Sequence, residues 1–110
     1  MSRQQEQKVL PLRQRPHVFL QLVRNLAGDT RNVKWSAHAR ERFEERDISN
    51  RMALDVIRKG EISGDIVAGR MAGEWRAKLT YPIPGRREVG VAIILIRETR
   101  TLVKTVEWGD

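Results

Sequence analysis

The hydrophobic pattern of this chain changes its period once, at Gly60, and this change most limits the folds that the chain can adopt. Before Gly60 the apolar residues recur every three or four positions, which is the spacing of one face of a helix. After Gly60 they alternate with polar residues or form short apolar runs, which is typical of strands. The sequence therefore predicts helices followed by a sheet, an α+β fold rather than alternating strand and helix units.

Three helices are expected before Gly60. The first covers residues 16–27, because Pro16 suits a first helical position and one apolar face follows, formed by Phe19, Leu22, Val23 and Leu26. We expect this face to pack on the sheet or on a second copy of the chain, which would make a homodimer. The second helix covers residues 36–47 and begins at a good N-cap residue. The third begins at residue 49 or 50 and ends at Gly60.

Three or four antiparallel strands are expected after Gly60. Residues 62–67 suggest a short strand or a ragged pair of strands, and residues 75–81 alternate as a half-buried strand does. Residues 89–96 are nearly all apolar, as expected of a central strand covered on both faces, and residues 101–108 form the last strand. The predicted architecture is N-terminal helices packed on one face of a small three- to four-stranded antiparallel sheet.

The length of 110 residues predicts one domain. Residues 1–15 have no apolar period and are expected to form a flexible basic arm, followed by a single domain over residues 16–110. The chain has no cysteine, which excludes a disulfide framework and a thiol nucleophile. It has no apolar run near the roughly 18 residues that a membrane-spanning helix needs. We expect a soluble, cytoplasmic protein that does not enter a membrane.

The net charge of +7 is large for a chain of this length. Lysine and arginine gain free energy when they release the counterions condensed on phosphates, so this excess favours a polyanionic partner such as a nucleic acid. An acidic protein partner would satisfy the same charge.

The second predicted helix places three basic side chains in one strip. His38, Arg42 and Arg46 are spaced four residues apart, and each step rotates by only about 40° around the helix. The strip borders the apolar residues Ala39 and Phe43, and therefore the seam between helix and sheet. An imidazole can act as acid or base near neutral pH, and guanidinium groups bind phosphate oxygens, so the strip suits metal-free cleavage of a phosphodiester. Spacing alone favours a structural role instead, in which the arginines cover apolar surface and pair with Glu45 or another acid.

A family resemblance rests on the same helix. The string His38-Ala39-x-x-Arg42-x-x-x-Arg46-x-Ile48-Ser49, followed by a short helix and Gly60, resembles a widespread bacterial family of unknown function with a His-Ala-x-x-Arg helix. That family is similar to the RelE-like ribonuclease toxins. The match covers residues 34–108 and leaves residues 16–28 as an additional helix. It implies a metal-independent endoribonuclease or an inactive relative, with RNA as partner, at the ribosome or free of it, and with an acidic antitoxin protein.

The resemblance assigns catalytic roles to His38, Arg42 and Arg46 only. In RelE-like toxins the working residues also include basic or aromatic groups on the sheet, which makes polar strand residues further candidates, namely Lys78, Tyr81, Arg97 and Lys104. Each of these also fits an ordinary solvent-facing position. Trp75 and Trp108 could stack on bases, although core packing explains them as well.

Other chemistries find little support in the sequence. Acidic residues and histidines do not cluster at metal-ligand spacing, and the glycines after residue 60 do not match a phosphate-binding loop. We expect no metal and no cofactor. Three hypotheses remain: a toxin-like ribonuclease, a non-catalytic nucleic-acid-binding module, and an interaction protein that meets an acidic partner.

Overall fold

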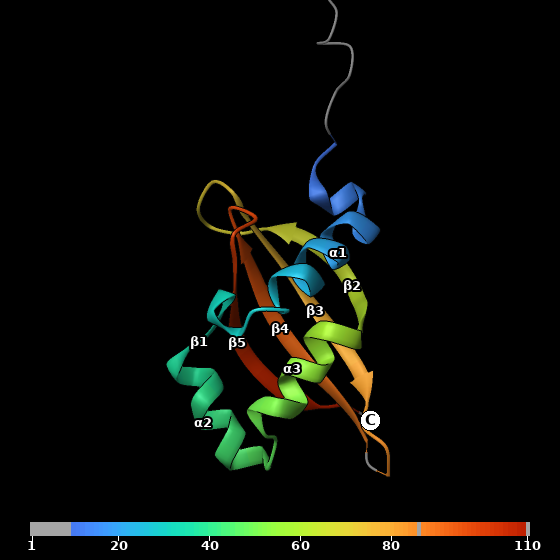
Figure 1. Ribbon diagram of the computed structural model, residues 1–110, viewed down its shortest axis with the longest axis vertical. Helices are drawn as coiled ribbons and strands as arrows, with labels where there is room; N and C mark the ends of the chain where they lie inside the picture. The colour runs from blue at the N-terminus through green and yellow to red at the C-terminus, as the bar shows by residue number, and fades with distance from the viewer. Residues whose placement is uncertain (1–9, 86, 110) are drawn as a thin grey trace, which may run out of the picture.

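The computed structural model describes residues 10–85 and 87–109 as three α-helices on one side of a five-stranded sheet (Figure 1). The helices are α1 (Pro16–Leu26), α2 (Ala37–Arg46) and α3 (Asn50–Lys59), and two short 3-10 turns, η2 (Leu12–Gln14) and η3 (Thr30–Asn32), flank α1. The strands are β1 (Val33–Trp35), β2 (Glu61–Ala68), β3 (Glu74–Pro82), β4 (Glu88–Ile96) and β5 (Arg100–Trp108). The expected α+β class is confirmed.

α2 and α3 begin directly after the serine caps that the sequence predicts. Ser36 accepts a hydrogen bond from the backbone N–H of Ala39 at 3.0 Å, and Ser49 accepts one from Met52 at 3.1 Å. α3 is followed by Gly60, which is buried against β3. A Cβ atom on Gly60 would lie 2.6 Å from the carbonyl oxygen of Thr80, so only glycine fits at this crossing.

The sheet order is β1-β5-β4-β3-β2, and β1 runs parallel to β5. The predicted sheet of three or four antiparallel strands is therefore wrong in two respects: it has five strands, and one pair is parallel. β1 has only three residues, too few to display an alternating pattern. Its buried Val33 is positioned by pairing with Thr101, which lies far away in the sequence.

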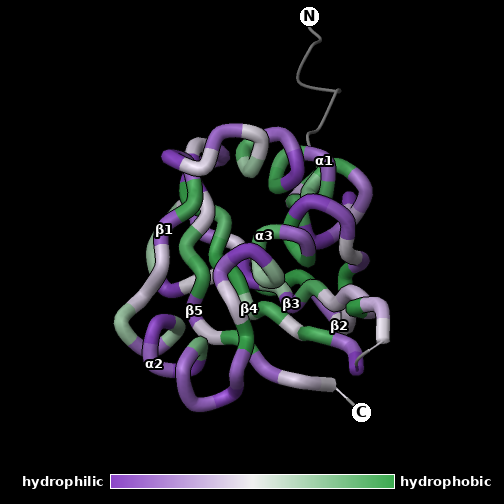
Figure 2. The backbone as a smooth tube through the Cα atoms, turned by 60° about the horizontal axis from the view of Figure 1, so that its bottom comes forward, coloured by the Kyte–Doolittle hydropathy of each residue, from purple (hydrophilic) through white to green (hydrophobic). Residues whose placement is uncertain are grey.

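The core lies between the helices and the sheet. α1 contributes Phe19 and Val23, both fully buried, and packs on α3 and on strands β2 and β5. This confirms that the first helix packs on the sheet. Figure 2 shows that the central strands carry long hydrophobic stretches, whereas α2 is mostly hydrophilic.

β4 is central in the sheet but is covered on one face only, so the predicted cover on both faces is wrong. Val91, Ile93 and Leu95 face the helices and are buried, whereas Ala92 and Ile94 lie on the other face and are half-exposed. Nothing among residues 10–85 and 87–109 covers that second face. Ala92 and Ile94 on this face are small or aliphatic residues, which occur at half-buried as well as at fully buried positions. The sequence alone therefore does not distinguish partial from full burial of β4.

The predicted arm reaches into the core at its C-terminal end. Leu12, in η2, is 2% exposed and belongs to the hydrophobic core, so the packed domain begins before residue 16. Residues 1–9 of the predicted arm lie outside the described residues.

Candidate functional site

The predicted strip on α2 does not form one open site. His38 is half-exposed in the first turn, and its Nδ1 atom lies 4.0 Å from the Glu41 carboxylate. Arg42 pairs with Glu45, one turn away on the same helix. Each of these two side chains thus faces an acid of its own helix, as an ordinary surface ion pair does.

Arg46, the third residue of the strip, lies at the seam between helix and sheet. Its Nη1 atom donates to the carbonyl oxygen of Val106 at 3.1 Å, and its own carbonyl oxygen accepts from the Trp108 indole at 2.6 Å. These bonds tie the end of α2 to β5. Trp108 packs against the core on the same side and carries the Arg87 guanidinium 5.5 Å from its ring centroid.

The uncovered face of the sheet gathers basic side chains from several strands. On β3 the residues alternate, so that Ala77 and Leu79 face the helices while Arg76 and Lys78 face away. Lys104, on β5, reaches the same uncovered face. The structure therefore brings together two of the predicted sheet residues, Lys78 and Lys104.

Two adjoining hollows lie on this face. The first hollow has a volume of about 320 Å³. It is lined by the following residues: Ser63, Asp65, Val67, Arg76, Ala77, Lys78, Ala92, Ile93, Ile94 and Lys104. The second hollow has a volume of about 490 Å³. It is lined by Arg70, Met71, Glu74, Arg76, Ile94, Leu102 and Lys104. Arg76, Ile94 and Lys104 line both hollows, so the two meet along these three residues.

Lys104 owes its position to an irregularity in the sheet. Ala92 pairs with Thr105 and the next residue, Ile93, pairs with Val103, so Lys104 is an extra residue on β5. Such a bulge re-aims the side chain that it carries. The backbone at this point is held by Ser36, whose hydroxyl donates to the Lys104 carbonyl oxygen at 2.9 Å.

Lys78 lies in the first hollow but is already paired. Its Nζ atom is 2.6 Å from a carboxylate oxygen of Glu107, two strands away on β5. The side chain reaches Glu107 by crossing β4 at Gly90, where an added Cβ atom would lie 2.8 Å from the Lys78 Cε atom. Gly90 thus leaves the space through which this ion pair forms.

Arg70, Arg76 and Lys104 differ from Lys78 in this respect. Within residues 10–85 and 87–109, the side chains of these three residues make no hydrogen bond or ion pair. Their positive charges are therefore available to a ligand in the hollows. Apolar surface is exposed beside them, since Val67 is 42% exposed and Met71 is 67% exposed.

The remaining predicted sheet residues lie elsewhere. Tyr81 pairs with the buried Val89 and packs against the core, on the face that the helices cover. Arg97 lies in the turn between β4 and β5 with a φ of 51°, and it lines neither hollow. Trp75 packs against the core, as the structural interpretation of this residue predicts.

Several residues of the hollows were not predicted from the sequence. Arg76 could have been found, because it precedes Lys78 by two positions and so lies on the same face of an alternating strand. Ser63 and Asp65 could not, since the pairing of β2 with β3 is irregular between Ser63 and Val67. Arg70 follows β2 in a loop whose path only the structure defines.

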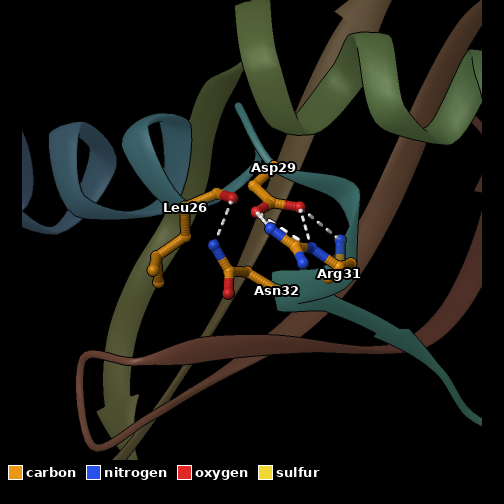
Figure 3. A network of polar contacts seen from close by, with 4 residues as sticks. All are labelled: Leu26, Asp29, Arg31 and Asn32. Atoms are coloured by element: carbon orange, nitrogen blue, oxygen red, sulfur yellow. Dashed lines mark hydrogen bonds and ion pairs between the residues drawn. The ribbon is translucent and has the colours of Figure 1, made fainter.

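A separate polar network, away from the hollows, joins the end of α1 to β1 (Figure 3). Asp29 accepts hydrogen bonds from the side chain and the backbone N–H of Arg31, and Asn32 donates to the Leu26 carbonyl oxygen at 3.1 Å. The Arg31 side-chain bond, and then the backbone bond, lower the pKa of the Asp29 carboxyl. This network fixes the chain between α1 and β1.

Comparison with known proteins adds no assignment: no protein-family model, no curated protein and no solved structure matches the chain. Within the described ranges, no three histidine or acidic side chains lie close enough to hold a metal ion. None of the helices described is long and apolar enough to cross a membrane.

Proposed function

We propose that this chain is an RNA-binding protein, related to the toxin-like ribonucleases, that binds RNA phosphates on the uncovered face of its sheet. The single observation that carries the proposal is the set of unpaired cations, Arg70, Arg76 and Lys104, around two hollows with exposed apolar surface. Phosphate contacts dominate the affinity of proteins for nucleic acids. Apolar surface beside cations suits a ligand that carries both phosphates and bases.

Other observations agree with a polyanionic ligand. The net charge is +7, and the helix motif from His38 to Ser49 resembles a family related to RNA-cleaving toxins. The surface proposed here differs from the predicted seam at α2, because the three residues of the strip already have partners: His38 lies beside Glu41, Arg42 pairs with Glu45 and Arg46 bonds the backbone of β5. A cytoplasmic location and an acidic antitoxin partner belong to the same proposal.

Metal-independent RNA cleavage is the second candidate function. Asp65, Lys78 and Lys104 line the first hollow together, so a carboxylate lies in the same hollow as two ammonium groups. The Asp65 carboxylate can accept the proton of a 2′-hydroxyl group, whose oxygen then attacks the phosphorus while the bond from phosphorus to the 5′-oxygen breaks. The Lys104 ammonium group can donate a proton to that leaving oxygen, and the cations can stabilise the charge that develops on the phosphate. His38, on α2, does not line this hollow.

The test of binding uses a labelled single-stranded RNA of mixed sequence and measures anisotropy at two salt concentrations. The double variant Arg76→Gln/Lys104→Gln removes two charges from the hollows. Arg40→Gln/Arg51→Gln removes two charges from exposed positions of the helices and is the matched control. We expect about tenfold weaker binding or more for the first variant and a smaller loss for the second, because only the first loses phosphate contacts.

The test of cleavage uses the same RNA in EDTA, with and without ribosomes. Cleavage that is lost in Asp65→Asn but kept in His38→Ala would support the second candidate function. Growth arrest on expression, relieved by the product of a neighbouring gene, would support the toxin–antitoxin relation. A wild-type protein that binds no RNA at low salt would overturn the proposal and favour an interaction protein with an acidic partner.

A further inference from the structure

The geometry points to a specific ligand unit for the uncovered face: two consecutive nucleosides of a single strand, one in each hollow, with the phosphate between them held by Arg76 and Lys104. This inference rests on the proposed function and deepens it. It assigns single-stranded rather than duplex RNA as the substrate class.

The two hollows share a boundary at which two cations lie. They adjoin along Arg76, Ile94 and Lys104, so the two available cations that both hollows share lie at their junction. A phosphate at this junction would have one hollow on each side. A phosphodiester in a single strand has the same arrangement, since it joins two nucleosides.

The size and the apolar lining of each hollow suit a nucleobase. Their volumes of about 320 and 490 Å³ fall within the range of small-molecule sites, which run from roughly 300 to 1,000 Å³. Ala92 lines only the first hollow and Leu102 only the second, and Ile94 lies beneath both. A base could lie against these aliphatic residues once it has left its partner strand.

Two exposed apolar side chains beside the hollows favour a single strand over a duplex. Val67 borders the first hollow and Met71 the second, and both expose more than a third of their surface. Contiguous exposed apolar surface marks binding sites, and these two side chains extend the apolar lining that Ala92, Ile94 and Leu102 give to the hollows. Bases paired inside a duplex could not reach them, because a duplex presents its phosphates and grooves rather than the faces of its bases.

The cations without an ion-pair partner lie where the phosphates of a single strand would be. Lys78 is paired with Glu107, and each hollow also contains one acid, Asp65 in the first and Glu74 in the second. Among the described residues of the hollows, the cations without an ion-pair partner are Arg76 and Lys104 at the junction and Arg70 beside the second hollow. One phosphate at the junction and a second near Arg70 would each meet a cation that has no ion-pair partner. An acidic peptide would lack the bases that the hollows accommodate.

The experiment compares a ten-nucleotide single-stranded RNA with the same sequence annealed to its complement, by anisotropy on the full-length protein. We expect at least about tenfold tighter binding of the single strand. The variant Ile94→Trp fills the floor of both hollows without a change of charge. It should weaken single-strand binding about tenfold or more, because the indole takes up the volume of the hollows that the bases would occupy. Ile96→Trp is the matched control, since Ile96 lies on the same face of β4 but lines neither hollow.

A second measurement remains informative if Ile94→Trp fails to fold. Amide shifts of the wild type are followed by NMR during titration with UMP and with the dinucleoside monophosphate UpU. UpU should shift residues of both hollows, including Ala92 and Leu102, whereas UMP should shift those of one hollow with the junction. Ala92→Phe and Leu102→Phe should each abolish the UpU shifts in one hollow.

The outcomes separate this inference from the proposed function. Equal affinity for single strand and duplex, with UpU acting no differently from UMP, would overturn the two-hollow assignment while RNA binding stands. A wild-type protein that binds no RNA would overturn both the proposed function and the two-hollow assignment. Preference for an acidic peptide over RNA, with the same loss in Ile94→Trp, would show that the hollows serve a protein partner instead.

Discussion

The Ser36 hydroxyl links the start of α2 to Lys104, because it accepts a hydrogen bond from the Ala39 N–H and donates one to the Lys104 carbonyl oxygen at 2.9 Å. The backbone N–H of Ser36 also donates to the Val103 carbonyl oxygen at 3.0 Å. One residue therefore caps a helix on one face of the sheet and fixes the bulge that presents a cation on the other face.

The Ser36 link predicts a coupled effect of Ser36→Ala. This variant loses the cap and the bond to Lys104, which should lower the free energy of unfolding by about 1–2 kcal/mol in urea denaturation. RNA affinity should also fall, because the bulge at Lys104 is released. Ser49→Ala is the matched control: it removes the cap of α3 only, so it should lower stability by about 1 kcal/mol and leave affinity unchanged. Equal affinity losses in the two variants would contradict the link.

The Lys78–Glu107 pair predicts that Glu107→Gln binds RNA more tightly than the wild type. Removal of the carboxylate frees the Lys78 ammonium group in the first hollow to contact one more phosphate. The plot of log affinity against log salt concentration should then become steeper by about 0.7. Anisotropy at several salt concentrations measures both effects. Glu44→Gln removes an exposed acid of α2 and should change the slope little. If both variants gave the same slope, the effect would be one of net charge alone.

Alanine substitution at two glycines should destabilise the fold to very different extents. Gly90→Ala would displace only the far end of the Lys78 side chain, so its free energy of unfolding should change by less than about 1 kcal/mol. Gly60→Ala would force a Cβ atom against the backbone carbonyls of Val56 and Thr80, which should cost about 3 kcal/mol. Thermal and urea unfolding of both variants test the difference. A Gly60→Ala protein as stable as the wild type would show that α3 can move away from β3.

The Asp29–Arg31 contact predicts a pH dependence with a definite sign. The folded-state pKa of the Asp29 carboxyl lies below its unfolded value, so the contact stabilises the fold above about pH 4 and is lost as the pH falls through the folded pKa. Carboxyl NMR titration of the wild type should give a lowered pKa for Asp29. In Arg31→Gln the pKa should return toward its ordinary value, because the side-chain bond is the largest cause. An unchanged pKa in that variant would assign the shift to the backbone bond.

The burial of α1 predicts that the domain does not fold without it. Phe19→Ala should lower the free energy of unfolding by about 3–5 kcal/mol, since the ring is fully buried. Gln21→Ala, at an exposed position of the same helix, should change stability by less than about 0.5 kcal/mol. Deletion of residues 1–28 should expose the apolar surface of α3 and the sheet and cause aggregation. A soluble, cooperatively folding truncation would contradict this.

The helices and most strands could be predicted because their signals are local. Caps such as Ser36 and Ser49, the stop at Gly60 and the alternation in β3 all act over a few residues. β1 could not be predicted in the same way. Its three residues form a strand only because Thr101 to Val103 lie beside them, and a parallel partner almost seventy residues away leaves no local pattern.

The site was predicted less well than the fold, for a related reason. Spacing predicts a basic strip on α2, but spacing does not say whether an arginine meets a ligand or, as Arg46 does, a backbone carbonyl. The hollows depend on which residues of different strands stand side by side, and on a bulge at Lys104 that shifts the register. The sequence identifies Lys78 and Lys104 as polar strand residues, but it does not show that their strands lie close enough for both to line one hollow.

The bond from Arg46 to Val106 has a consequence for how copies of this protein can meet. β1 covers β5 only as far as Val103, and beyond that point the carbonyls of Lys104 and Val106 accept bonds from Ser36 and Arg46. An added strand would have to displace both residues. At the opposite border, β2 departs from regular pairing between Ser63 and Val67, and Gly64 has a φ of 85°. Both borders thus resist the strand addition that leads to fibres, even while one whole face of the sheet stays open to a ligand.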